Sequence, residues 1–174
     1  MARRAIEAEL CGRVPPALPD VPGAQLKRGA FVTLEETESH DLRGCIGHVS
    51  DDRPLGEVIR QVAVSAARSD PRFPPVEASE LAGLRIEISV LSTPALVSTA
   101  DLCLDEKGLV IGRDGVLVRQ GGTQALLLPQ VATEQGLSRE AFLSAACHKA
   151  GLAPQSWREP ATQVFTFTAD VFVE

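Results

Sequence analysis

A cysteine lies between two glycines in the stretch LRGCIGH, which spans residues 42–48. Cys45 could act as a nucleophile, because a thiolate attacks electrophilic centres and can carry a covalent intermediate. Arg43 lies two residues before it, and a guanidinium beside a thiol favours the charged, reactive form of the sulfur. His48 follows three residues later as a candidate base. The segment therefore presents either a prepared thiol or a tightly packed piece of backbone.

Strand alternation decides which of these side chains can meet. If residues 42–49 form a strand, successive side chains point to opposite faces of the sheet. Arg43, Cys45 and Gly47 then share one face, and His48 lies on the other. A base must lie within hydrogen-bond reach of its nucleophile. The alternation therefore favours Arg43 over His48 as the functional neighbour of Cys45.

The two glycines of the segment support two interpretations. Gly44 and Gly47 leave room for another group to approach the backbone closely. In the first interpretation that group is a substrate, and the glycines line its site together with His48. In the second, the glycines serve packing between sheet and helix, and Cys45 is a small buried side chain. The residues alone leave both interpretations open.

A second polar residue, Glu87, lies on the strand-like segment LRIEISVL, residues 84–91. Its strict alternation predicts a half-buried strand with Glu87 on the polar face. If this strand neighbours residues 42–49, Glu87 could face Arg43 across the sheet and act as acid or base near Cys45. The alternative is a solvated ion pair that contributes about 0–1 kcal/mol.

Gln130 follows a proline-terminated strand in LPQVATEQG, residues 128–136. A polar side chain at such a strand end could form the rim of a substrate pocket, and the same sequence would equally suit a surface loop. Trp157 is the one tryptophan of the chain. A lone tryptophan more often anchors a core than binds a ligand, so we expect it in the core.

The remaining histidine and cysteine candidates suggest a weak metal hypothesis. Cys147 belongs to the apolar stripe of a helix and is expected in the core, with His148 beside it in solvent. Cys45, His48 and His148 could together hold a metal ion. Their spacing matches none of the usual structural zinc patterns, so the sequence predicts no metal site and identifies no cofactor.

The segments that position these residues alternate irregularly between strands and helices. Asp114-Gly115 is a favoured hairpin-turn dipeptide, Asp52 is placed to cap one helix and Ser138 another. Mixed hairpins and separate helices indicate an α+β fold with antiparallel or mixed sheets flanked by helices. The expected helices cover 3–11, the segment from Pro54 to Pro71, and 139–150; the expected strands cover 30–36, 42–49, 84–91 and 163–173, with a hairpin over 108–122.

Composition excludes several classes of function. The chain has 174 residues, 23 acidic against 17 basic side chains, and a net charge of −6. This charge argues against a nucleic-acid binder and against a protein that docks on anionic membranes. No apolar run approaches the ~20 residues of a membrane-spanning helix. The four cysteines form no CxxC pair, and together these features predict a protein of the reducing cytoplasm.

Several segments together resemble one family. The segments LRGCIGH, DPRFPPV, LRIEISVLS, the GLVI hairpin, LPQV and the closing stretch from Trp157 to FTADVF follow the order of the AMMECR domain family. The LRGCIG segment at 42–47 is the most specific mark of that family. The resemblance covers nearly the whole chain, from about residue 3 to residue 174.

The resemblance implies a fold and a cellular setting. The fold would be a single AMMECR-type domain over 1–174, built as a compact α+β structure of two subdomains. The chain is similar to the A component of the AmmeMemoRadiSam system, which implies a Memo-type protein and a radical S-adenosylmethionine enzyme as partners in a modification system. The residues themselves suggest the catalytic roles: Cys45 as nucleophile or covalent acceptor, Arg43 to stabilise its thiolate or bind an anionic group, and Glu87 as acid or base. Family membership does not fix a reaction, and a non-enzymatic adaptor in which LRGCIG is structural is the alternative.

Overall fold

The computed structural model of the chain describes residues 1–49, 52–102 and 108–174. It divides into two compact units, one formed by residues 1–91 with 170–174 and the other by residues 92–169. Two units agree with the two subdomains that the family resemblance implies, and the mixture of helices with antiparallel strands confirms the α+β class. Cys103 lies outside the described residues.

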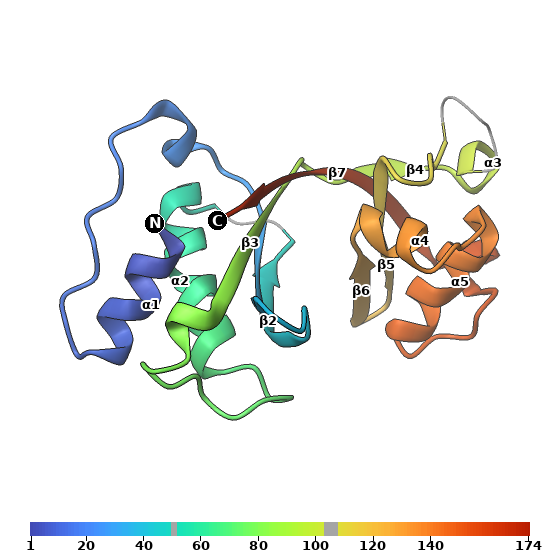
Figure 1. The fold of residues 1–174 in the computed structure, drawn as a ribbon. Coiled ribbons are helices and arrows are strands. Elements are labelled where there is room, and N and C mark those ends of the chain that lie inside the picture. The colour runs from blue at the N-terminus through green and yellow to red at the C-terminus, as the bar shows by residue number, and fades with distance from the viewer. Residues whose placement is uncertain (50–51, 103–107) are drawn as a thin grey trace. The chain divides into compact units, whose positions relative to one another are not determined.

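The first unit places helices against one face of a sheet (Figure 1). Its sheet has the order β2-β1-β3, followed by the end of β7, and β1 runs antiparallel to both of its neighbours. Helix α2 packs on β1 and β2, and α1 packs on α2. The elements are α1 (Ala2–Leu10), β1 (Ala30–Glu36), β2 (Leu42–His48), α2 (Leu55–Arg68), β3 (Leu84–Leu91) and β7 (Gln163–Val173).

The predicted hairpin of β1 and β2 forms, with one irregularity that matters for the site. Leu34 lies opposite Gly44, while the next residue, Glu35, lies opposite Leu42. Arg43 is therefore an extra residue on β2, which makes a β-bulge. A bulge turns the affected side chain away from regular alternation, so the direction of Arg43 could not be deduced by counting residues from Cys45.

Helix α2 provides most of the apolar surface that covers this sheet. Val58, Val62 and Ala63 are fully buried, and Ala66 is 2% exposed, as the three- and four-residue spacing predicted. The prediction that Asp52 caps the helix is wrong. The helix begins at Leu55 with Pro54 in the capping position and no side-chain cap, because the proline already supplies the extended backbone of a helix start.

The second unit is built around the first part of β7, which lies between β4 and β5. Helix α5 packs on β5 and β6, and its Ser138 cap accepts from the Ala141 N–H at 3.3 Å, as predicted. Trp157 is 1% exposed in this core, which confirms its expected place. The elements are β4 (Ala95–Val97), α3 (Thr99–Leu102), β5 (Asp114–Gln120), β6 (Thr123–Leu127), α4 (Pro129–Glu134) and α5 (Arg139–Lys149).

The hairpin predicted over 108–122 has its turn in a different place. Asp114 and Gly115 begin strand β5, and the turn between β5 and β6 falls at Gly121, whose φ is +58°. The buried Asp114 carboxylate accepts from the Val110 N–H at 2.9 Å and holds the turn that precedes the strand. Because this carboxylate is needed inside the fold, Asp114-Gly115 is not available as an exposed turn.

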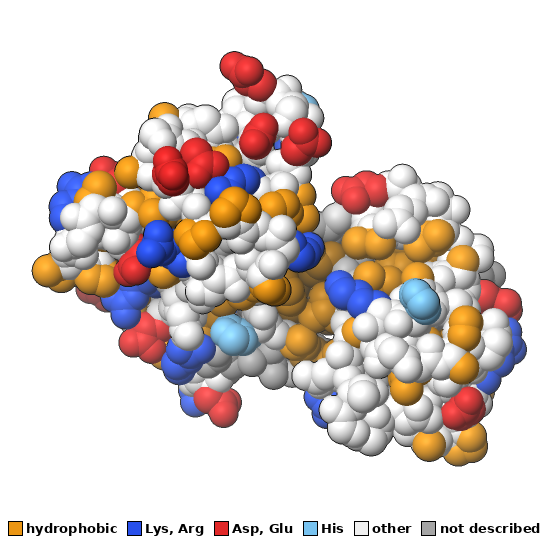
Figure 2. All heavy atoms as spheres, turned by 90° about the horizontal axis from the view of Figure 1, so that it is seen from below, with side chains coloured by type: hydrophobic (Ala, Val, Ile, Leu, Met, Phe, Trp, Pro, Cys, Tyr) orange, Lys and Arg blue, Asp and Glu red, His pale blue; other side chains and the backbone are white. Residues whose placement is uncertain are grey.

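No helix in the described part of the chain is long and apolar enough to cross a membrane. On the face seen in Figure 2, acidic and basic side chains are interspersed on both units.

Candidate functional site

Three side chains form a row across the sheet of the first unit. Cys45 on β2 lies opposite Thr33 on β1, and Thr33 lies opposite Glu87 on β3. Adjacent strands are about 4.8 Å apart, so Glu87 is two strand spacings from the cysteine. The sequence hypothesis that 84–91 could neighbour 42–49 is wrong, because β1 separates them. Glu87 therefore faces Thr33 and not Arg43.

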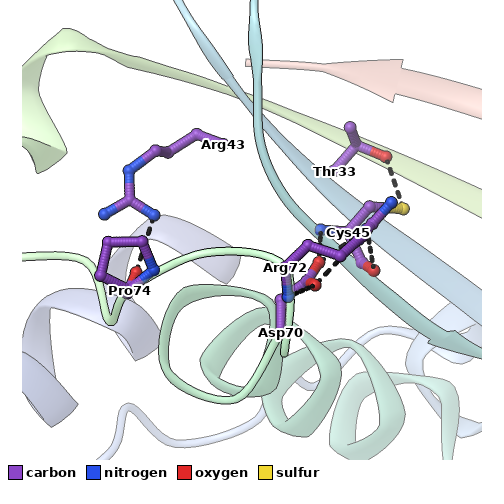
Figure 3. Close-up of polar contacts among 6 residues, drawn as sticks. All are labelled: Thr33, Arg43, Cys45, Asp70, Arg72 and Pro74. Carbon is purple, nitrogen blue, oxygen red and sulfur yellow. Dashed lines mark hydrogen bonds and ion pairs between the residues drawn. The ribbon is translucent and has the colours of Figure 1, made fainter.

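Thr33 makes a direct contact with the thiol. Its hydroxyl donates a hydrogen bond to Cys45 Sγ at 3.3 Å, and Cys45 is only partly buried (Figure 3). A negatively charged acceptor makes a stronger hydrogen bond than a neutral one. The hydroxyl of Thr33 is therefore placed to stabilise a developing charge on the sulfur.

Asp70 anchors the backbone of the cysteine. Its carboxylate accepts from the Cys45 N–H at 2.8 Å and, through the other oxygen, from the Arg72 N–H at 3.1 Å. The side chain is 2% exposed. Hydrogen bonds from the Arg72 side chain hold the pKa of Asp70 well below its usual range, against the opposing effect of burial. Asp70 is therefore a buried carboxylate that stays ionised.

Arg72 brings a guanidinium to the cysteine. Its Nε and Nη2 donate to Asp70 at 2.9 and 2.7 Å, and Nη2 also donates to the Cys45 carbonyl at 3.2 Å. The guanidinium carbon lies 5.4 Å from the centre of the Phe73 ring. The hydrogen bond to Asp70 is the main cause that raises the pKa of Arg72. The cation is thus held in one orientation beside Cys45.

Sequence reasoning missed Asp70 and Arg72 as site residues. Both belong to the segment DPRFPPV, which was recognised only as part of the family resemblance. The sequence does contain a signal for a polar site, because Asp70 and Arg72 lie on either side of Pro71 directly after a helix. Nothing in the one-dimensional pattern says that this pair folds back onto the cysteine strand.

Arg43 donates its hydrogen bonds to Glu80 and Pro74. It donates from Nε and Nη2 to Glu80 at 2.9 and 3.2 Å, and from Nη1 to the Pro74 carbonyl at 2.9 Å. Figure 3 shows its guanidinium directed to Pro74, while Arg72 is the guanidinium at Cys45. The ion pair, chiefly its hydrogen bond, lowers the pKa of Glu80. Arg43 therefore fixes Pro74, at the C-terminal end of the 71–75 loop that carries Arg72.

Both glycines of the LRGCIG segment are in close contact with the chain itself. A Cβ on Gly44 would lie 2.3 Å from the carbonyl oxygen of Ala66 in α2, and a Cβ on Gly47 would lie 2.3 Å from the Phe31 ring. Real Cβ atoms do not approach other atoms so closely. These contacts give both residues a packing role, and their part in substrate binding stays a prediction.

His48 and Gln130 are not brought to the thiol by any described contact. His48 lies opposite Ala30, an odd number of residues from Cys45, so the two side chains point to opposite faces of the sheet. Gln130 lies in the first turn of α4 in the second unit, where its carbonyl accepts from the Thr133 hydroxyl at 2.8 Å. Their part in substrate binding stays a prediction.

Within residues 1–49, 52–102 and 108–174, no group of three or more His, Cys, Asp or Glu side chains is arranged to hold a metal ion. Cys147 is fully buried in α5, where burial raises the pKa of its thiol, and His148 is exposed. Both positions confirm the expectation for this helix.

One buried hydroxyl on the same sheet face as Glu87 has no partner. Ser89 is two residues further along β3 and 1% exposed, and its Oγ makes no hydrogen bond within the described structure. Its neighbour across the sheet is Phe31, whose own neighbour is Gly47. Buried polar groups without partners are uncommon in folded proteins.

Comparison with known proteins identifies the family of the chain. The AMMECR1 family model matches residues 1–172. A protein of Methanothermobacter thermautotrophicus is 43% identical, with all of this chain and 91% of the relative aligned. Protein MK0488 of Methanopyrus kandleri is 44% identical over 85% of this chain and 72% of its own length.

A solved structure gives the same result for the fold. The crystal structure of uncharacterized protein PH0010 from Pyrococcus horikoshii is 41% identical, with a TM-score of 0.90. The alignment covers 99% of this chain and 87% of that one. Sequence and structure agree over almost the full length, and the chain therefore belongs to the AMMECR1 family.

Proposed function

We propose that this domain uses Cys45 as a nucleophile or covalent acceptor within a modification system. The observation that carries the proposal is the double contact at this residue. Thr33 donates to the sulfur, and Arg72, aligned by a buried Asp70, donates to the carbonyl of the same cysteine. A thiol in a partly exposed, electropositive setting is the environment in which cysteines react.

The chemical step would form one bond and break one. The sulfur gives an electron pair to an electrophilic centre, and the leaving group departs with the pair from the broken bond. The thiol proton leaves through solvent to Glu87, the next residue in the row, while the Thr33 hydroxyl keeps donating its hydrogen bond to the sulfur. Glu87 acts as the acid or base, and Arg43 positions the Arg72 loop through Pro74.

The proposed setting is the cytoplasm, with a Memo-type protein and a radical S-adenosylmethionine enzyme as partners. It rests on the resemblance of the whole chain, treated as one domain over 1–174, to the A component of the AmmeMemoRadiSam system. Gly44, Gly47 and His48 of the first unit, and separately Gln130 of the second unit, would be substrate-binding residues.

The first test measures thiol reactivity residue by residue. We expect iodoacetamide at about pH 7 to alkylate Cys45 faster than N-acetylcysteine, by about tenfold. Peptide mass spectrometry follows each cysteine separately, with exposed Cys11 and buried Cys147 as internal references. Thr33→Val should slow the reaction at Cys45 and leave Cys11 unchanged. A Cys45 as unreactive as Cys147 in the folded protein would rule out the proposal.

The alternative function is a non-enzymatic adaptor that binds another protein. One observation favours it: Val171, Phe172 and Val173 at the end of β7 are 47%, 59% and 51% exposed. Apolar side chains exposed together are a feature of interaction surfaces. Cys45→Ser separates the two functions, because an adaptor keeps its partner binding and cellular effect in this variant, whereas a nucleophile loses its effect with the fold intact.

A further inference from the structure

We infer that Arg72 is the binding group for an anion, a carboxylate or phosphate carried by the electrophile that reacts with Cys45. The inference rests on the proposed function and adds the chemical class of the substrate. A guanidinium is suited to this task, because its planar donors match the oxygens of carboxylates and phosphates.

The donors of Arg72 are divided between protein and solvent. Nε and Nη2 are used by Asp70 and by the Cys45 carbonyl. The side chain is 53% exposed, so part of the guanidinium faces solvent. Asp70, the acidic member of the pair, is 2% exposed. An incoming molecule therefore meets the cation, while the balancing negative charge lies behind it.

The exposed guanidinium is also fixed, which separates it from an ordinary surface arginine. It is bound by both oxygens of Asp70 and lies over the Phe73 ring. Its loop, residues 71–75, contains three prolines and is held at the far end by Arg43. A donor whose orientation is already set loses less conformational entropy on binding a ligand.

The experiment compares a charged and a neutral reagent of nearly equal size. Iodoacetate and iodoacetamide differ in a carboxylate, so the ratio of their rate constants at Cys45, divided by the same ratio for N-acetylcysteine, measures the preference for the anion. We expect this normalised preference for iodoacetate to be about three to ten in the wild type. In Arg72→Gln it should fall to about one, because the guanidinium is lost. Arg60→Gln removes one positive charge from α2 and should leave the ratio unchanged. Inorganic phosphate should slow the iodoacetate reaction if phosphate is also accepted.

A direct binding measurement separates this inference from the proposed function. Acetate and inorganic phosphate are titrated into ¹⁵N-labelled wild type and Cys45→Ser, and the Arg72 Nε–H and residue 45 N–H signals are followed. Chemical-shift changes that saturate in both proteins support the anion site even if Cys45 proves unreactive. In Arg72→Gln the signal of residue 45 should then no longer shift. A reactive Cys45 with a ratio of one, or shifts that never saturate, would overturn the anion site and leave the nucleophile in place.

Discussion

At the scale of single residues, the site is organised by a carboxylate and not by the cysteine itself. Asp70 accepts from the Cys45 backbone and from three nitrogens of Arg72. A buried charge is tolerated only when it is fully hydrogen-bonded. The local fold and the position of the guanidinium therefore depend on the same side chain.

Asp70→Asn should lower the free energy of unfolding at neutral pH by about 1.5–3 kcal/mol, since hydrogen bonds to a charged group are lost. Because Arg72 depresses the pKa of Asp70, its stabilising contribution is present above about pH 4 and is lost as the pH falls further. Urea unfolding from neutral pH to about pH 3 measures this slope. The wild type should lose more stability towards acid than Asp70→Asn does. Asp20→Asn, at an exposed position, is the control, and parallel pH profiles for wild type and Asp70→Asn would contradict the assignment.

At the scale of elements, β2 combines a bulge with two close contacts. The bulge at Arg43 sends this side chain to the loop, and Gly44 lets α2 approach the strand. The same helix ends just before Asp70, so the approach of α2 to β2 also sets where Asp70 can reach Cys45. The packing interpretation and the chemical interpretation of LRGCIG therefore describe one arrangement.

Gly44→Ala should destabilise the protein by about 1–3 kcal/mol, because a methyl group 2.3 Å from the Ala66 carbonyl forces the backbone to shift. Gly83→Ala is the matched control, since a Cβ there meets nothing within 4 Å. Chemical denaturation gives both values, and the control should stay within about 0.5 kcal/mol of the wild type. Equal stability of the two variants would show that the helix does not press on the strand.

At the scale of the whole molecule, the last strand serves both units. Residues up to 169 of β7 belong to the second unit, and residues 170–174 belong to the first. There the Glu174 N–H donates to the Ile86 carbonyl at 3.0 Å, and its carboxylate pairs with Arg3 at 2.7 Å. The C-terminus thus completes the sheet that carries the cysteine row.

Removal of residues 170–174 should destabilise the first unit by about 1–2 kcal/mol through lost strand pairing. Glu174→Gln, which removes only the exposed ion pair, should cost about 0–1 kcal/mol. Hydrogen exchange of the β3 amides reports on the first unit directly, and faster exchange in the truncated chain is the expected result. Unchanged protection of β3 would show that this unit does not need its last strand.

The sequence alone determined the main helices and strands of the first unit and the candidate nucleophile. Alternation defined β1, β2, β3 and β7 closely, and the apolar stripe defined α2, because local periodicity follows directly from which face of an element is buried. Cys45 was selected on other grounds, from its residue type and its place between Gly44 and Gly47 near Arg43. Asp114-Gly115 was misplaced, since its local turn preference was outweighed by a carboxylate required in the interior.

Only the tertiary structure decided which groups surround the thiol. Counting residues along the strand predicted Arg43 as the neighbour of Cys45. A one-residue bulge directs Arg43 elsewhere. The guanidinium that contacts Cys45 is that of Arg72, held by Asp70, which lies 25 residues away along the chain. The tertiary structure also placed β1 between Cys45 and Glu87. Strand order, bulges and loop return depend on contacts between distant segments, and such contacts leave no periodic signal in the sequence that makes them.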